Sequence, residues 1–296
     1  MPSSPDKREP AAVIGLGAIG TVLAAALAEA GREVVVCGRR QVDRVEVTDG
    51  DGTRTYPVRW VAEPADVAAY PWVVLATKMH HTADVAPWLD ATTDPSSRVV
   101  VAQNGIDHAA RVGPLVAGRV VPTVVYINAE RTGRGAARAR PTSASELLVP
   151  DDEDGRAAAE VFTAGGLRVE PVADFRTAAW RKLLTNVVGN PITALTGRRA
   201  EVLHEPRVAE LAMSILRETV AVARADGADL PDGVAEETLA WLHALPPDGS
   251  SSMLQDREAG RPLEYDGLTG AVVRLAEAHG VPVDANRTIL ALLSAL

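Results

Sequence analysis

The chain has 296 residues, enough for two domains of ordinary size, and 47% of its residues are hydrophobic, which allows an ample core. Its formal net charge of −9 at pH 7 argues against a nucleic acid or an anionic membrane as partner, because their phosphates would be repelled on average. A single cysteine, Cys37, excludes an internal disulfide framework and leaves no cysteine cluster for zinc, so we expect no metal site and expect Cys37 to pack in a strand.

The first apolar stretch superficially resembles a secretory signal. Residues 11–28 are uncharged and follow Lys7 and Arg8. Cleavage there would discard the glycine motif described next, and no other stretch approaches the roughly 18 apolar residues of a membrane span. We therefore expect a cytoplasmic protein.

Three glycines follow the first predicted strand, AAVI, at the spacing G-x-G-x-x-G. In such a loop the first glycine allows a sharp turn, the second admits a pyrophosphate to the backbone, and the third lets the following helix lie close to the strand. The helix pattern TVLAAALAEAG and a second strand, Glu33 to Cys37, supply the context that the motif requires. We predict a dinucleotide site formed by Gly15, Leu16, Gly17, Ala18, Ile19 and Gly20; a purely structural turn or another nucleotide-like ligand is the alternative.

The end of the second predicted strand indicates which dinucleotide binds. Sites for NAD usually carry an acidic residue about 20 residues beyond the glycines, whereas arginine there suits a 2′-phosphate. This chain has Gly38, Arg39 and Arg40 and no acid. We therefore favour NADP(H) with Arg39 at the 2′-phosphate; the alternative is that both arginines are ordinary solvated charges.

The rest of the first half alternates short β runs with helical stretches, which predicts a doubly wound parallel sheet of Rossmann type. Its further predicted strands are Pro71–Ala76, Arg98–Ala102, Arg119–Ile127 and Glu146–Val149. We expect the arginine-rich stretch from Arg131 to Arg140 and the acidic run from Asp151 to Asp154 to be solvated loops.

Beyond Asp174 the β signals nearly vanish, so we predict an NADP-binding domain over residues 1–174 and an all-α substrate domain over residues 175–296. The predicted helices are Arg176–Leu195, Arg207–Asp226, Val234–Ala244 and Glu264–His279. Such an arrangement favours a small-molecule site in a cleft between domains, with substrate groups supplied by the second half.

A polar stripe lies on the first of these helices. Lys182, Asn186 and Asn190 recur at four-residue intervals, so they fall within an arc of about 80° on one face. Pro191 predicts a kink or break at Asn190. The spacing fits an ordinary amphipathic helix whose polar side meets water. It equally fits a lysine that protonates a carbonyl oxygen while the amides bind the substrate.

Several motifs in the same order along the chain resemble the ketopantoate reductase family (2-dehydropantoate 2-reductase). They are GLGAIG, ATK at Ala76–Lys78, AQNG at Ala102–Gly105, WRKLLTNVVGNPITAL, and SSMLQDREAGRPLEYDGLTG from Ser251. The resemblance implies NADPH-dependent reduction of a 2-oxo acid, here 2-dehydropantoate to pantoate on the pantothenate route. It implies that Lys182 is the general acid.

The resemblance also implies roles for residues whose local pattern has a plainer explanation. Asn186, Asn190 and Ser252 would bind substrate, Glu264 would serve in catalysis, and Lys78 and Asn104 would touch the cofactor. Alternatively, Ser252 caps its own helix, Glu264 stabilises the first turn of its helix, Asn104 belongs to an Asn-Gly turn, and Lys78 is a solvated charge.

The chain departs from the family pattern at two places. Where the family usually has T-E-I-D and then N-G, this chain has Leu263–Asp266 and then Thr269–Gly270, and the region GRRAEV lacks a further substrate-binding asparagine. A reductase of another 2-oxo acid or ketone and a non-catalytic NADP-binding sensor are therefore the alternatives; two arginines after the second strand disfavour a methyltransferase. The sequence does not determine the oligomeric state, and a homodimer is compatible with it.

Overall fold

The computed structural model describes residues 9–140 and 145–296. The chain folds into two compact units. The first comprises the described residues up to Gln103 together with Asp107–Phe175, and the second comprises Asn104–Ile106 and Arg176–Leu296.

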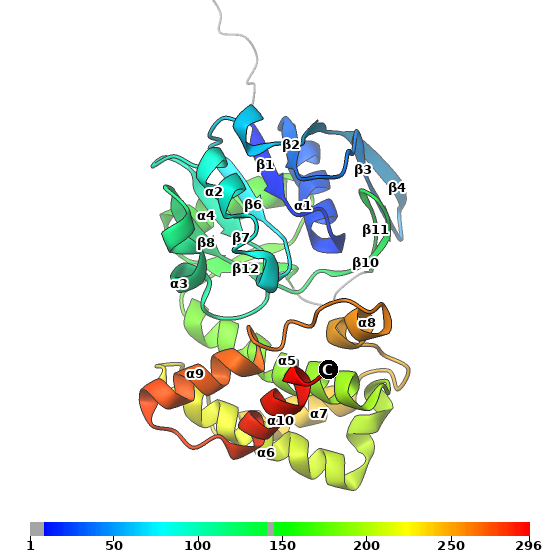
Figure 1. The fold of residues 1–296 in the computed structure, drawn as a ribbon, viewed down its shortest axis with the longest axis vertical. Helices are drawn as coiled ribbons and strands as arrows, with labels where there is room; N and C mark the ends of the chain where they lie inside the picture. Colours follow the sequence, from blue (N-terminus) through cyan, green and yellow to red (C-terminus); the bar gives the residue numbers. More distant parts are fainter. Residues whose placement is uncertain (1–8, 141–144) are drawn as a thin grey trace, which may run out of the picture. The chain divides into compact units, whose positions relative to one another are not determined.

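A six-stranded parallel sheet forms the centre of the first unit (Figure 1). In spatial order its strands are β5 (Arg59–Val61), β2 (Val34–Cys37), β1 (Ala11–Ile14), β6 (Trp72–Leu75), β7 (Arg98–Val101) and β8 (Arg119–Pro122). From β1 the chain builds toward the β5 edge and then returns past β1 to β6, so the strand order reverses between β1 and β6. This doubly wound topology confirms the predicted Rossmann-type sheet.

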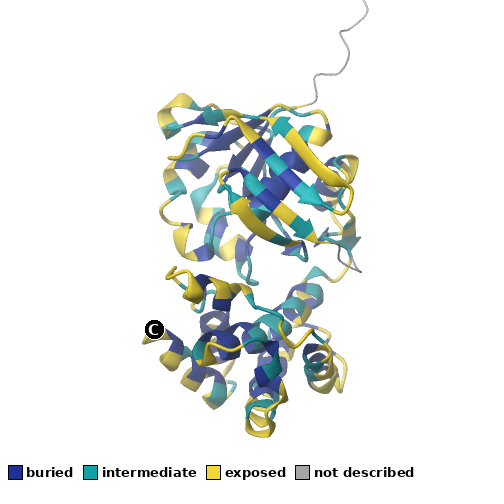
Figure 2. Ribbon diagram, turned by 90° about the vertical axis from the view of Figure 1, so that its right-hand side faces the viewer, coloured by how far each residue is buried: buried dark blue, intermediate teal, exposed yellow. Residues whose placement is uncertain are grey.

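Both faces of this sheet are covered by helices, which explains why its strands read as continuous apolar runs. Ala11 and Val13 pack with α1 (Ala18–Glu29) and α4 (Glu153–Ala164), whereas Ala12 and Ile14 pack with α2 (Ala86–Thr92) and α3 (His108–Val112). All residues of β1 and of β6 are buried. Dark blue marks buried residues in the interior of this unit in Figure 2. Cys37 is buried in β2, as the sequence predicts.

A second sheet corrects the prediction for Arg131–Arg140. This stretch belongs to the antiparallel strands β10 (Asn128–Gly133) and β11 (Ala136–Arg140), and β11 pairs with β3 (Arg44–Asp49), which pairs with β4 (Gly52–Pro57). The loop prediction is wrong because the arginines alternate with alanines: Ala137 is buried in the core that includes α1, while Arg138 and Arg140 are exposed.

The predicted strand Arg119–Ile127 is divided in two. After β8 the chain changes partners, and β9 (Val124–Val125) joins a third sheet with β12 (Leu147–Pro150) and β13 (Val169–Val172). The acidic run is also not a loop throughout. Asp152 caps α4 by accepting a hydrogen bond from the Gly155 amide at 2.8 Å, and Asp154, inside the first turn, pairs with Arg98 and Arg119 at 2.7 and 2.9 Å.

Short 3₁₀ helices complete the connections: η1 (Pro64–Asp66), η2 (Met79–His81), η3 (Gly113–Leu115) and, in the second unit, η4 (Ala200–His204). The second unit otherwise consists of α5 (Phe175–Thr196), α6 (Pro206–Ala225), α7 (Val234–His243), α8 (Ser252–Glu258), α9 (Thr269–His279) and α10 (Asp284–Ser294). Its described residues contain no strand, which agrees with the all-α prediction.

Two predictions for these helices differ from the structure. Of the kink or break predicted at Asn190, the break is absent, and helix α5 continues through Pro191. An internal proline costs roughly 3 kcal/mol, but each buried aliphatic side chain contributes roughly 1.5–3 kcal/mol, and Val187, Val188 and Ile192 bury the helix on both sides of the proline. The helix predicted to start at Glu264 begins at Thr269, because residues 261–264 form an irregular segment followed by a turn.

Candidate functional site

The glycine loop has the geometry that a phosphate site requires. Gly15 follows β1 at a φ of +97°, and a Cβ at this position would lie 2.6 Å from the Thr77 amide nitrogen. At Gly20 a Cβ would lie 1.9 Å from the Gly15 carbonyl oxygen. Both positions therefore exclude any larger residue, because the neighbouring atoms belong to the backbone.

Gly17 differs from these two glycines, because a Cβ built on it would meet nothing within 4 Å. It is the N-cap of α1, and within the described chain no side chain caps this helix end. The first turn, which begins with Ala18 and Ile19, therefore keeps amide groups available beside an open backbone. The space and the donors fit a dinucleotide pyrophosphate.

The end of β2 fits the phosphorylated form of the dinucleotide. Gly38 has a φ of +155°, and Arg39 and Arg40 follow it as exposed residues. Neither arginine has an ion pair within the part of the chain that the structure describes, so their guanidinium groups are available to a ligand. A 2′-phosphate could accept hydrogen bonds from them, whereas residues 38–40, directly after β2, include no acid to accept from a ribose hydroxyl.

Lys78 and Asn104 follow the adjacent parallel strands β6 and β7, and both are half-buried. Lys78 immediately precedes η2. Asn104 belongs to the three-residue segment Asn104–Ile106 of the second unit, where its Nδ2 donates a hydrogen bond to Glu264 Oε2 at 3.4 Å. The Asn-Gly turn is present as well: Gly105 has a φ of +100°.

Because α5 is unbroken, Lys182, Asn186 and Asn190 keep their common face. Lys182 and Asn186 are half-buried, and Asn190 is buried. Removal of water from around the Lys182 ammonium lowers its pKa from 10.5 to about 8. A lysine with this pKa is a practical proton donor near neutral pH, which an ammonium in bulk water is not.

The start of α8 adds to this face. Ser252 Oγ lies 3.5 Å from Asn190 Oδ1, and Ser252 is exposed. Ser252 does not cap the helix, contrary to the plainer reading of the sequence: the cap is Ser251, whose Oγ accepts from the Leu254 amide at 3.0 Å and lies 2.6 Å from Thr193 Oγ1. The Ser252 hydroxyl is thereby left for other partners.

Glu264 also has a different environment from the one its plainer reading predicts. It is 7% exposed and precedes α9 by five residues, so it does not act on the first turn of that helix. A buried carboxylate needs hydrogen-bond donors, and Asn104 supplies one of them.

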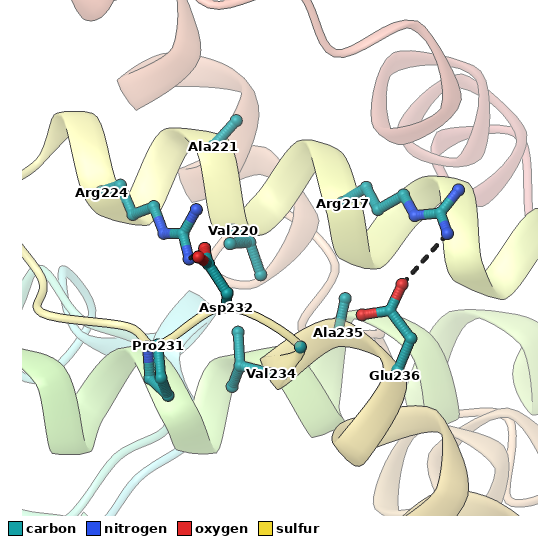
Figure 3. A pocket seen from close by; sticks show the side chains of 10 residues that line it. Arg217, Val220, Ala221, Arg224, Pro231, Asp232, Val234, Ala235 and Glu236 are labelled. Atoms are coloured by element: carbon teal, nitrogen blue, oxygen red, sulfur yellow. Dashed lines mark hydrogen bonds and ion pairs between the residues drawn. The ribbon is translucent and has the colours of Figure 1, made fainter.

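The second unit also contains a cavity of about 220 Å³ beside the start of α7 (Figure 3). Its charged lining residues are already paired: Arg217 with Glu236 at 3.0 Å and Arg224 with Asp232 at 2.8 Å. None of the predicted site residues lines this cavity. We therefore do not assign the reaction to it.

No three histidine, cysteine, aspartate or glutamate side chains in residues 9–140 and 145–296 gather as metal ligands. Over the same residues, no helix has the length and apolar character that crossing a membrane demands.

A Rossmann unit with a G-x-G-x-x-G loop after its first strand, followed by a helical unit with a lysine and two asparagines on one helix face, is the arrangement of a dinucleotide-dependent oxidoreductase. The chain belongs to the ketopantoate reductase family. The family description "Ketopantoate reductase PanE/ApbA" matches residues 11–147, and its C-terminal counterpart matches residues 174–296.

Individual relatives match over nearly the whole chain. A 2-dehydropantoate 2-reductase from Caulobacter vibrioides is 38% identical over 286 residues, covering 96% of this chain and 98% of its own. One from Mycobacterium tuberculosis is 36% identical over 292 residues, covering 96% of each. The crystal structure of a PanE/ApbA family ketopantoate reductase from Ralstonia eutropha JMP134 superposes with a TM-score of 0.87 at 31% identity, covering 97% of each chain.

The structure draws attention to two residues that sequence reasoning missed. Ser251, next to Ser252, caps α8 and contacts α5. Gln103, next to Asn104, is 4% exposed and has several hydrogen-bond partners. The sequence marks both residues only by their place in the motifs SSM and AQNG. Their contacts with Thr193 and with Thr77 and Thr82 join residues distant in sequence, so the sequence alone does not predict them.

Proposed function

We propose that this chain reduces 2-dehydropantoate to pantoate with NADPH, with Lys182 as the general acid. The observation that carries the proposal is the half-buried Lys182 with a pKa of about 8, on the same helix face as Asn186 and Asn190. In this proposal residues 1–174 form the NADP-binding domain and residues 175–296 the substrate domain.

Bound NADPH supplies the hydride that C2 of the substrate accepts. Lys182 donates a proton to the oxygen on C2, which would otherwise develop a full negative charge. Below pH 8 the lysine is mostly protonated and ready to donate. Its lowered pKa also reduces the cost of giving the proton up.

The remaining side chains orient the substrate. Asn186 and Asn190 offer amide donors and acceptors, and Ser252 offers a hydroxyl donor to the substrate carboxylate. Neutral donors of this kind can hold a carboxylate without a competing ion pair on Lys182. Glu264, buried and hydrogen-bonded to Asn104, is proposed to accept a hydrogen bond from a substrate hydroxyl or from Lys182.

On the cofactor side, the proposal assigns the pyrophosphate to the loop Gly15–Gly20, including the backbone of Leu16, Ala18 and Ile19. The 2′-phosphate is assigned to Arg39. Lys78 and Asn104 are assigned to the part of the cofactor that lies beyond the pyrophosphate, because ligands of doubly wound sheets bind outside the carboxyl ends of the strands.

The test is to mix the purified protein with NADPH and 2-dehydropantoate and to follow the loss of reduced-nicotinamide absorbance. We expect turnover with NADPH and much less with NADH at equal concentration. A panel of other 2-oxo acids serves as the control for substrate identity. Faster turnover of another oxo acid would replace the substrate, and binding of NADPH without turnover of any compound would make the chain a sensor instead.

We also keep a cytoplasmic location and a homodimer as proposals from the sequence. Cell fractionation and sedimentation of the purified protein test them. Membrane-associated protein or a purely monomeric species at micromolar concentration would contradict them.

A further inference from the structure

A buried polar cluster lies at the carboxyl ends of β6 and β7 and consists of residues other than those assigned above. We define the Gln103 cluster as Gln103, Thr77, Thr82 and His108. Gln103 Nε2 donates to the Thr77 carbonyl oxygen at 2.9 Å and lies 3.1 Å from Thr77 Oγ1 and 3.2 Å from Thr82 Oγ1. Gln103, Thr82 and His108 are each less than 5% exposed.

The orientation of the Gln103 amide is determined by chemistry. The Thr77 carbonyl oxygen can only accept, so the amide nitrogen must face it. Gln103 Oε1 then lies 3.3 Å from Thr82 Oγ1, which can donate to it. The Gln103 carbonyl oxygen is 2.9 Å from His108 Nε2, so this ring nitrogen carries a proton, and the backbone of Gln103 is held as well as its side chain.

Through these bonds Gln103 holds both ends of the turn that carries Lys78. Thr77 precedes Lys78, and Thr82 is the C-cap of η2, which starts directly after Lys78. Inside the turn the His81 amide donates to the Lys78 carbonyl oxygen at 2.9 Å. The turn therefore has a fixed beginning and end, and a single side chain, two residues after the end of β7, fixes both.

The same cluster reaches the glycine loop. Thr77 approaches Gly15 so closely that a Cβ on Gly15 would overlap its amide nitrogen. The loops after β1, β6 and β7 are thus joined by backbone contact and by the Gln103 amide. Since strand order reverses between β1 and β6, the loops after β6 and β7 lie on the opposite side of the pyrophosphate seat from Arg39.

We propose that Gln103 is a positioning residue that fixes Lys78 for the nicotinamide half of the cofactor and leaves the adenosine half untouched. The inference rests on the proposed function, because it takes NADPH as the ligand. Gln103 itself is buried beneath the turn and acts through Thr77 and Thr82.

The experiment compares two ligands on the variant Gln103→Met, which keeps the length of the side chain and removes its hydrogen bonds. NADPH spans the whole site, whereas adenosine 2′,5′-bisphosphate contains only the adenosine half. We expect NADPH affinity to fall about tenfold, as for the loss of one or two buried hydrogen bonds, and the affinity of the bisphosphate to change by less than about twofold. Isothermal titration calorimetry measures both.

Two further variants separate positioning from general destabilisation. Thr92→Val removes a buried hydroxyl that donates to Trp88 O in α2 at 2.6 Å, and it should lower the melting temperature without changing the ratio of the two affinities. Thr82→Val removes one member of the Gln103 cluster and should shift the ratio in the same direction as Gln103→Met, by a smaller factor.

Equal losses for both ligands in Gln103→Met, or an unchanged NADPH affinity, would overturn the inference and leave Gln103 a structural residue. Wild-type protein that binds neither ligand would overturn the proposed function instead. The two failures are therefore distinguishable from the wild-type titrations alone.

Discussion

In the first unit the candidate site is made chiefly of backbone, whereas in the second it is made of side chains on one helix face. The glycine loop is defined by a positive φ at Gly15 and by the close approach of Gly20 to the Gly15 carbonyl. The α5 stripe depends on the identity of Lys182, Asn186 and Asn190 and on how much water reaches each of them. At Gly15 and Gly20 the backbone leaves no room for an added Cβ, whereas the α5 side chains are tuned by their surroundings.

The largest effect should come from the side-chain region. Lys182→Ala removes the proton donor, so turnover should fall about a hundredfold or more, while NADPH affinity stays close to that of the wild type. Steady-state kinetics and a direct NADPH titration measure the two quantities. In the wild type the reduction rate should decline above about pH 8, where the ammonium is lost, and the variant should lack this decline. Near-normal turnover in the variant would show that another group donates the proton.

The next effect concerns the exposed end of β2. Arg39→Ala removes a guanidinium proposed to bind the 2′-phosphate, so NADPH affinity should fall about ten- to a hundredfold, as for the loss of a hydrogen bond between charged groups. NADH affinity should not fall, because NADH has no phosphate there. Arg138→Ala, on the exposed face of β11, is the matched control for loss of a surface arginine. Parallel losses for both cofactors would place the 2′-phosphate elsewhere.

The backbone region is tested by a pair of glycine substitutions. Gly20→Ala should lower the free energy of unfolding by about 1–3 kcal/mol, because its Cβ would overlap the Gly15 carbonyl oxygen and force the loop to move. Gly17→Ala should leave stability nearly unchanged, since its Cβ meets open space, but it should weaken NADPH binding. Urea denaturation and cofactor titration separate the two outcomes. Equal destabilisation by both substitutions would contradict the geometry of the loop.

The smallest expected effect is a gain of stability. The pKa of Lys182 is about 8 in the folded chain and 10.5 in the unfolded chain. Between pH 8 and pH 10.5 the unfolded chain therefore binds more protons than the folded chain, so the free energy of unfolding rises with pH over this range. Below pH 8 the half-buried ammonium carries its full desolvation cost. Lys182→Met should therefore raise the free energy of unfolding by about 1–2 kcal/mol at pH 7, a figure reduced for the partial exposure of the lysine.

This advantage should shrink as the pH rises from 8 to 10.5 and vanish above it, which urea denaturation at several pH values can follow. Lys78→Met is the matched control, because it removes a half-buried lysine from the other unit. A Lys182→Met variant that is less stable than the wild type at pH 7 would mean that the ammonium stabilises the fold.

The sequence predicts the backbone region well because its signals are local. The glycine loop can be recognised from its spacing directly after a strand and before a helix, although the contact that excludes a Cβ at Gly15 comes from the distant Thr77. The α5 stripe follows from the helical period of 3.6 residues, so four-residue spacing suffices to gather it. The motifs that resemble the family extended this prediction to Ser252 and Glu264, whose local patterns alone would not single them out.

The predictions that failed depend on distant contacts. Arg131–Arg140 looks like a solvated loop until β3 pairs with β11 and turns its alanines toward the core. Pro191 looks like a helix break until the burial of Val188 and Ile192 is taken into account. Likewise, the two candidates for the cap of α8, Ser251 and Ser252, are neighbours in the sequence. Helical periodicity does not locate the first residue of a helix to within one position.

The reversal of strand order beside β1 has a consequence for how such an enzyme can be altered. The phosphate that distinguishes one cofactor from the other is proposed to contact the end of β2, and the reactive ring the ends of β6 and β7, on opposite sides of a shared central strand. Substitutions can then change the preference for one cofactor without changing the ability to catalyse the reaction. Exchange of residues 38–40 alone should redirect the enzyme toward the unphosphorylated cofactor while its proton-donating helix stays as it is.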